Sequence, residues 1–198
     1  MTKLHRVIFI PGLSDDTKKL EWAVRGWKKH GLEPVVHSIG WRDGEVSFKP
    51  KLQRLLNLID KFVEQGDQVS LVGTSAGGSA VLNAFIKRKD SIHKVINVCG
   101  RLKVGPTSGF RPFQSKTQTS PAFAESVKLC ENGIKSLDES DLKKIMTVHA
   151  MFGDELVPSE TTIIKGALNT KVPTAEHIIS IASALTIFSK PLIDFLNR

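Results

Sequence analysis

The stretch VSLVGTSAGG, residues 69–78, constrains the fold of this 198-residue chain more than any other. Its first half is a run of β-forming residues, and the small and apolar residues after Ser75 recur at helical spacing. The pattern predicts a buried strand that turns directly into a helix, with Ser75 at the turn. Gly73 and Gly77 flank the serine symmetrically and allow strand and helix to pass close to a strained backbone.

Strand patterns and helix patterns alternate along most of the chain. The predicted strands are residues 6–10, 34–39, 69–72, 94–98, 145–152 and 161–164. The clearest predicted helices are 17–30, 51–63, the one after Ser75, one that begins at Ser120, and 178–188, with a final segment restarted by Pro191. Strands separated by helices pair in parallel, so the expected class is α/β, a mostly parallel sheet with helices on both faces.

The alternation is interrupted over residues 101–144. Gly, Pro, Ser and Thr are frequent as far as Ser120, which can cap an amphipathic helix with Pro121 in its first turn. Long irregular segments in compact domains are often functional. We therefore expect one domain over residues 1–198 with a lid-like insertion at 101–144. Its Phe110, Phe113 and Phe123 either line an apolar substrate groove or anchor the loop to the body.

Composition narrows the class of protein. Hydrophobic residues make up 40% of the chain, enough for one sizeable core. The apolar stretch before Pro11 is too short for a signal peptide, and no run approaches a membrane span, so we expect a soluble, cytoplasmic protein. Cys99 and Cys130 are expected to be free, buried thiols, and no metal-ligand spacing links them to a histidine. No metal or cofactor is predicted, and the oligomeric state stays open.

Positive charge is concentrated in one window. The formal net charge is +8, and between residues 86 and 116 eight basic residues oppose only Asp90: Lys87, Arg88, Lys89, Lys94, Arg101, Lys103, Arg111 and Lys116. Such a window is either a solvated basic face or a site for an anionic partner. Nucleic-acid binding is disfavoured because no stacking-aromatic motif or known nucleic-acid module accompanies the charge.

Three side chains predict nucleophilic chemistry. Ser75, Asp154 and His177 each lie in a loop after a predicted strand, in the order nucleophile, acid, histidine. Hydrolysis at a serine needs the hydroxyl, a base to accept its proton and an acid to hold that base. His149 is the alternative base, but its place within a strand directs it to one face of the sheet. Glu155 is the alternative acid.

The G-x-S-x-G turn, the order of the three residues and the stretch FGDELVP around Asp154 resemble the α/β-hydrolases, in particular serine esterases and lipases. The resemblance covers nearly the whole chain. It implies that the backbone N–H groups of Leu13 and Ala76 form the oxyanion hole. It also implies hydrolysis of a small carboxylic ester, or a related thioester or amide, through an acyl-enzyme on Ser75. The alternative is a non-catalytic binding module on the same fold, possibly for an acidic partner.

Overall fold

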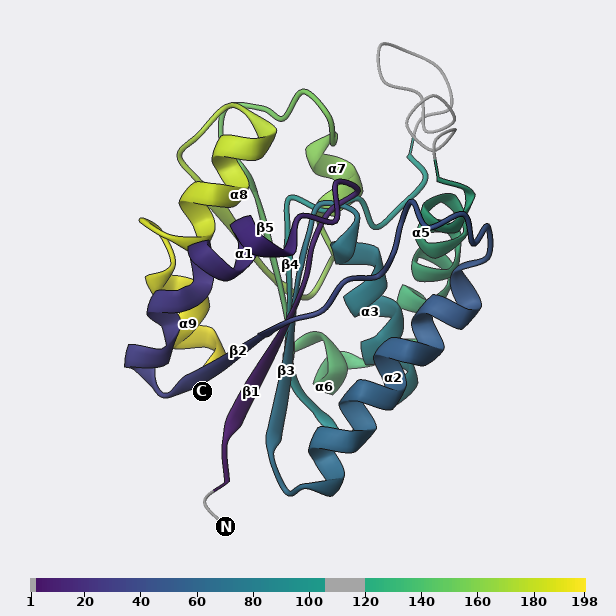
Figure 1. The fold of residues 1–198 in the computed structure, drawn as a ribbon. Helices are drawn as coiled ribbons and strands as arrows, with labels where there is room; N and C mark the ends of the chain where they lie inside the picture. Colours follow the sequence, from purple (N-terminus) through teal and green to yellow (C-terminus); the bar gives the residue numbers. More distant parts are fainter. Residues whose placement is uncertain (1–2, 106–119) are drawn as a thin grey trace.

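The protein is built on one six-stranded sheet in which every neighbouring pair of strands is parallel (Figure 1). The computed structural model describes residues 3–105 and 120–198. In spatial order the strands are β2 (Leu32–Val36), β1 (His5–Ile10), β3 (Gln68–Thr74), β4 (Ile92–Val98), β5 (Ile145–Ala150) and β6 (Leu168–Val172). The four inner strands are buried on both faces over most of their length, which explains their continuous apolar runs.

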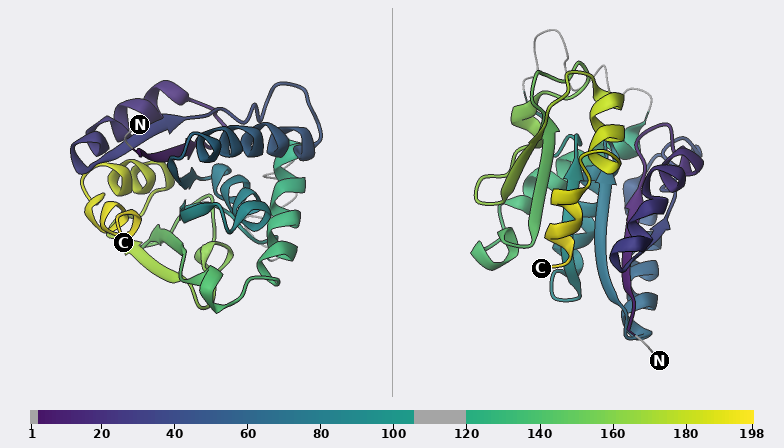
Figure 2. Two further views of the ribbon diagram at one scale, coloured as in Figure 1. Left: turned by 90° about the horizontal axis from the view of Figure 1, so that it is seen from below. Right: turned by 90° about the vertical axis from the view of Figure 1, so that its left-hand side faces the viewer.

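Helices cover both faces of the sheet, and the two sides of each of the four inner strands belong to different cores (Figures 1 and 2). One face carries α2 (Phe48–Glu64), α3 (Gly77–Arg88) and α5 (Pro121–Ile134). The other carries α1 (Thr17–Val24), the 3₁₀ helix η1 (Arg25–His30), α8 (His177–Leu185) and α9 (Lys190–Leu196). Two single-turn helices, α6 (Glu139–Leu142) and α7 (Ser159–Thr162), complete the described elements. The predicted α/β class is confirmed.

One predicted strand is wrong. Residues 161–164 do not enter the sheet: Pro158 starts the short helix α7, whose Thr161 N–H bonds the Pro158 carbonyl at 2.9 Å. The last strand is β6, and the sequence LNTKV gives little sign of it. As the edge strand it is mostly exposed, with only Val172 buried, so it needs no apolar run.

The expected insertion is described in part. Phe110 and Phe113 lie outside the described residues. α5 packs against α3 and α2 as a helix of the main body, and Ser120 caps it as expected, accepting the Phe123 N–H at 3.3 Å. The Phe123 ring is only 5% exposed and meets the Trp41 ring edge-on at 5.8 Å. This contact is that of an anchor, and a role for Phe123 in substrate binding stays a prediction.

Several basic residues in the described part of the basic window are engaged in the fold, whereas Arg111 and Lys116 lie outside the described residues. Arg88 binds both carboxylate oxygens of Asp60 at 2.8 and 3.0 Å, and Lys89 binds Asp141 at 2.6 Å. Arg101 is buried and donates to the carbonyls of Lys103 and Val104. These contacts leave fewer charges for an anionic partner than the sequence suggests.

The two thiols and the C-terminal helices complete the description. Cys99 and Cys130 are free and buried, as predicted, and burial raises the pKa of both thiols. Among the described residues no single helix is both long and apolar enough to cross a membrane. The pair α8 and α9 meets those criteria only when counted together, across a bend of 58°.

Candidate active site

Ser75 occupies the sharp turn between β3 and α3. Its φ of +52° lies in the left-handed region, which is strained for a residue with a side chain. The turn is held on both sides, because the Ser75 N–H donates to Val98 O and the Ser75 carbonyl accepts from Gly78 N–H, each at 3.0 Å. The flanking glycines are required by contact: a Cβ on Gly73 would overlap the Gly77 carbonyl, and one on Gly77 would overlap the Ile10 carbonyl. The turn therefore presents the serine side chain in one fixed orientation.

The structure joins the three predicted catalytic side chains in one hydrogen-bonded series. His177 Nε2 lies 2.9 Å from Ser75 Oγ, and His177 Nδ1 lies 2.7 Å from Asp154 Oδ2. His177 and Asp154 are both nearly buried, with side chains 4% exposed. With the ring proton on Nδ1 toward the carboxylate, Nε2 is free to accept a proton from the hydroxyl. This arrangement is the one that a serine nucleophile, its base and its acid would need.

The Asp154 carboxylate is set to stay ionised. Burial by itself would raise its pKa, but the hydrogen bond and charge of His177 and the backbone N–H groups of Val157 and Leu156 outweigh burial, so the pKa is lowered. Both amides donate to Oδ1 at 2.8 Å, which leaves Oδ2 directed at the histidine. One oxygen is thus fixed by the backbone and the other orients the base.

His177 is the first residue of α8, and two further carboxylates fix that helix end. Glu176 caps the helix by accepting the Ile179 N–H at 2.7 Å, and Glu155 accepts the His177 N–H at 2.9 Å. Glu155, the alternative acid, therefore binds the backbone of the histidine, while Asp154 binds its ring. Sequence reasoning gave Glu176 no role, because the residues that usually cap a helix N-terminus are Ser, Thr, Asp and Asn.

The candidate oxyanion hole lies where the loop after β1 meets the nucleophile turn. Gly12 passes so close to Ser75 that an added Cβ would come within 2.9 Å of the serine Cβ. Leu13 is the next residue of that loop. Ala76 stands at the N-terminus of α3, where helix amides favour negative charge. These positions fit the expected donors, and their role in stabilising an oxyanion stays a prediction.

The alternatives do not form a second site. His149 lies within β5 with Nδ1 buried and unpartnered, and the ring that reaches Ser75 is that of His177. In the described residues no group of three or more His, Cys, Asp and Glu side chains is placed to hold a metal ion.

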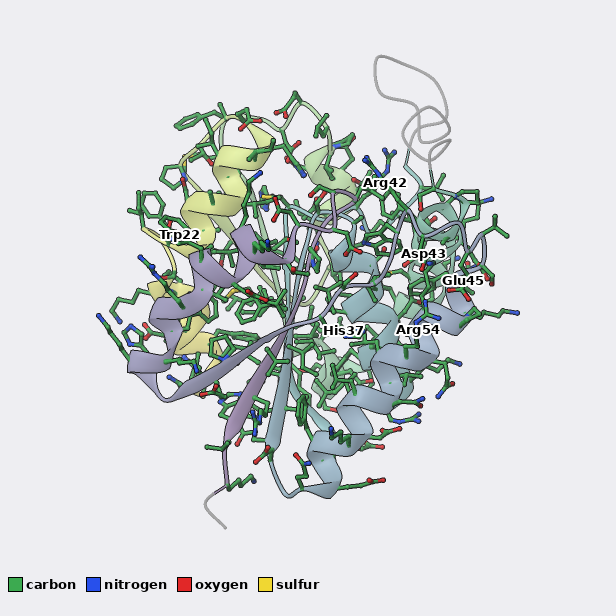
Figure 3. All side chains as sticks on the ribbon, in the orientation of Figure 1. Trp22, His37, Arg42, Asp43, Glu45 and Arg54 are labelled. Atoms are coloured by element: carbon green, nitrogen blue, oxygen red, sulfur yellow. The ribbon has the colours of Figure 1, made fainter. Side chains whose placement is uncertain are left out.

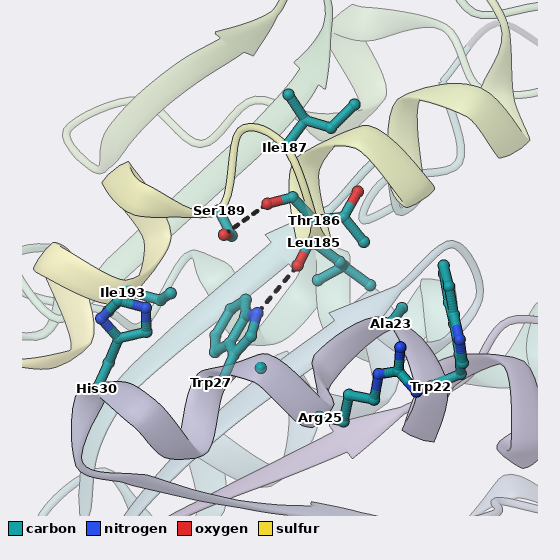
Figure 4. Close-up of a pocket in the computed structure, with 11 residues that line it drawn as sticks. Trp22, Ala23, Arg25, Trp27, His30, Leu185, Thr186, Ile187, Ser189 and Ile193 are labelled. Atoms are coloured by element: carbon teal, nitrogen blue, oxygen red, sulfur yellow. Dashed lines mark hydrogen bonds between the residues drawn. The ribbon is translucent and has the colours of Figure 1, made fainter.

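A separate surface cavity of about 450 Å³ lies between α1 and η1 on one side and the end of α8 on the other, lined by Trp22, Trp27 and Ile187 among others (Figure 4). None of the three catalytic candidates lines it.

Comparison with known proteins bears on the fold. No protein-family model and no curated protein sequence matches the chain. Among solved structures, the pyrethroid hydrolase PytH is similar with a TM-score of 0.68 and 12% identity, over 98% of this chain and 98% of its own. The monoacylglycerol lipase of Paleococcus ferrophilus has a TM-score of 0.66 and 14% identity, over 96% and 93%. Est1E from Butyrivibrio proteoclasticus has a TM-score of 0.66 and 17% identity, over 98% of this chain and 88% of its own. The parallel sheet, the strand–serine–helix turn and these likenesses together show that the chain has the α/β-hydrolase fold.

Proposed function

We propose that this protein is a serine hydrolase that cleaves a small carboxylic ester through an acyl-enzyme on Ser75. The observation that carries the proposal is the series Ser75 Oγ–His177–Asp154, with contacts of 2.9 and 2.7 Å. A serine at a strained, left-handed turn with a histidine on its hydroxyl has no evident structural purpose. The names lipase, serine hydrolase and pyrethroid hydrolase among the structural neighbours support the same class of reaction.

In the proposed mechanism each step has its own side chain. His177 Nε2 accepts the hydroxyl proton as Ser75 Oγ attacks the ester carbonyl, and the N–H groups of Leu13 and Ala76 stabilise the oxyanion. His177 then donates that proton to the leaving alcohol, and an acyl-enzyme forms. Water, deprotonated by the same nitrogen, attacks the acyl carbon and releases the acid. Asp154 keeps the imidazole oriented and stabilises it while it carries the extra proton.

The test is hydrolysis of p-nitrophenyl esters of graded acyl length by the wild type and by Ser75→Ala. Loss of a nucleophile that works in such a unit typically lowers kcat on the order of 10⁴- to 10⁶-fold. The matched control is Ser136→Ala, because Ser136 is an exposed serine that bonds only the Gly133 carbonyl among the contacts described. The control should keep wild-type activity, and Ser75→Ala should keep the wild-type circular dichroism spectrum.

Covalent labelling separates the enzyme from a binding module. A fluorophosphonate reacts with a serine whose hydroxyl is activated by a base, so the wild type should be labelled and Ser75→Ala should not. A wild type that neither reacts with the probe nor cleaves any of the esters would overturn the proposal. More than about a tenth of wild-type turnover in Ser75→Ala would move the chemistry to another residue.

A further inference from the structure

A fully buried lysine lies at the start of α2. The Lys51 side chain is 0% exposed, and its Nζ contacts Asp43 Oδ1 at 2.5 Å, the Gly40 carbonyl at 2.6 Å and Glu45 Oε2 at 3.4 Å. Two considerations make this position unusual. A cation in the first turn opposes the helix dipole, and burying an ion pair seldom adds net stability. A role in holding a particular conformation accounts for the placement better than stability does.

The segment that Lys51 holds is the loop after β2, residues 38–45. The residue of this loop that Lys51 contacts through its carbonyl is Gly40, whose φ of +72° favours a glycine. The Gly40 carbonyl accepts from Lys51, and the Gly40 N–H donates to Asp15 Oδ2 at 2.9 Å. One residue thus connects the buried ammonium of α2 with the loop after β1.

That second loop, residues 11–16, carries the candidate oxyanion donor Leu13. The 38–45 loop binds the 11–16 loop on both sides of Leu13. On the N-terminal side of Leu13, the Trp41 indole N–H donates to the Pro11 carbonyl at 3.3 Å. On the C-terminal side, Asp15 accepts from the Gly40 N–H and from the Ser38 hydroxyl. Asp15 itself has a φ of +54°, a strained conformation that such external contacts must maintain.

Trp41 is in turn fixed by its surroundings. Its ring stacks on Phe48 at 5.9 Å with 11° between the planes, and its carbonyl accepts from the Ser120 hydroxyl at 3.0 Å. Figure 3 shows Asp43, Glu45 and Arg54 grouped near the start of α2, at the outer end of the same loop. The 38–45 loop is therefore anchored inside by Lys51 and Trp41, and outside by Arg54, which binds Glu45 at 2.7 Å.

We propose that Lys51 is a positioning residue that, through Gly40, Asp15 and Trp41, holds the 11–16 loop and the Leu13 amide in place for catalysis. The catalytic part of this inference rests on the proposed serine hydrolase function. The structural part does not, and the two are measured separately.

The structural part is tested by hydrogen exchange of the indole N–H groups in ¹⁵N-labelled protein. The chain has three tryptophans, and Trp41 and Trp27 both donate their indole N–H to a backbone carbonyl. In Lys51→Met, which removes the three donors but keeps an apolar stem, the Trp41 indole should lose protection at least about tenfold. Trp27, bonded to Leu185 O on the other face of the sheet, should be unchanged and serves as the internal control. Unchanged protection of Trp41 overturns the inference, even if the wild type cleaves no ester.

The catalytic part is tested by comparing an ester with its thionoester, in which sulfur replaces the carbonyl oxygen. An oxyanion hole built for oxygen makes the wild type prefer the ester strongly, because its donors are placed for that atom. If Lys51 positions a donor, Lys51→Met lowers kcat/KM for the ester roughly 10- to 100-fold but lowers kcat/KM for the thionoester much less. The ratio of the ester kcat/KM to the thionoester kcat/KM therefore decreases. A general loss of folded protein lowers both substrates equally and leaves the ratio unchanged.

Two further variants make the result decisive. Lys49→Met makes the same substitution at an exposed lysine two positions before Lys51 in α2, and it should leave both readouts at wild-type values. Trp41→Phe keeps an aromatic ring on Phe48 and removes only the donor to Pro11, so it tests the same link if Lys51→Met fails to fold. A wild-type ester-to-thionoester ratio in both Lys51→Met and Trp41→Phe overturns the catalytic role.

Discussion

One carboxylate oxygen of Asp154 accepts from backbone N–H groups and the other faces the His177 ring, and this division predicts the behaviour of the Asp154→Asn variant. Asp154→Asn can keep the contacts of Oδ1 with Val157 and Leu156, so the fold should persist. An amide NH₂ facing His177 Nδ1, however, favours the proton on Nε2, the nitrogen that must accept from Ser75. We expect kcat to fall on the order of 10³- to 10⁴-fold with a small change in thermal stability. Steady-state kinetics and a melting curve on the same sample measure both.

The same residues should behave as a unit. His177→Ala removes the base directly, and adding Asp154→Asn to it should cost far less than the product of the two single effects. Glu155→Gln is the matched comparison, because glutamine can still accept the His177 N–H and the residue does not bind the ring. A greater loss of kcat in Glu155→Gln than in Asp154→Asn would transfer the role of the acid to Glu155.

At the scale of elements, the close contact between the loop after β1 and the nucleophile turn gives the sharpest prediction. Gly12 has no unusual φ, so alanine is allowed by its backbone, but the new Cβ would stand 2.9 Å from that of Ser75. The loop must shift, and with it the Leu13 amide. Gly12→Ala should therefore lower kcat/KM by about tenfold or more while the protein stays folded.

Gly26→Ala is the control for that substitution. Gly26 lies in η1, is exposed, and a Cβ there would meet nothing within 4 Å. Its activity should equal that of the wild type, and its unfolding free energy should be the same or up to about 1 kcal/mol higher, since alanine restricts the unfolded chain. Wild-type kinetics in Gly12→Ala would mean that the loop can yield without moving the site.

Elements were predictable from sequence where burial dictates composition. The inner strands must be apolar on both faces, and the turn at Ser75 must have glycines where backbones touch, so both leave a local pattern. Strand β6 lies at the sheet edge and is mostly polar, which is unusual for a strand. Helix α7 is a single turn packed against β5 and contains β-branched threonines, which are more typical of strands. The contacts of Lys51 and Asp15 join residues that carry no mutual signal, since a lysine in a helical stretch is ordinarily solvated. The hydrogen-bonded series of Ser75, His177 and Asp154 was predictable because the proposed chemistry demands particular residue types. The contacts that hold the surrounding loops in place were not predictable.

For the whole molecule, four buried or partly buried histidines couple folding to pH. Burial lowers the pKa of His5, His37, His93 and His149 below the ordinary histidine value. The effect is largest for His5, whose pKa is about 4, since the charge of His93 adds to burial. The two rings meet edge-on at 5.5 Å, and His5 Nε2 lies 2.8 Å from Ser70 Oγ. A histidine with a lowered pKa in the folded state binds fewer protons there than in the unfolded chain.

The sign of the pH dependence follows from that difference. Between the unfolded histidine pKa of about 6.5 and a folded value near 4 for His5, the unfolded chain binds more protons, so stability falls as the pH falls through this window. We expect a loss on the order of 1–3 kcal/mol between pH 7 and pH 4, measured as the urea midpoint at fixed ionic strength. Carboxylates with lowered pKa, Asp154 among them, add a further loss of stability at lower pH as they are protonated.

His5→Gln, which can still bond Ser70, should flatten the dependence of stability on pH between pH 6.5 and 4, whereas His30→Gln at an exposed site should not. A urea midpoint that stays constant from pH 7 to pH 4 in the wild type would contradict the lowered pKa values of these rings. Equal slopes in His5→Gln and the wild type would mean that His5 is not the main source of the pH dependence.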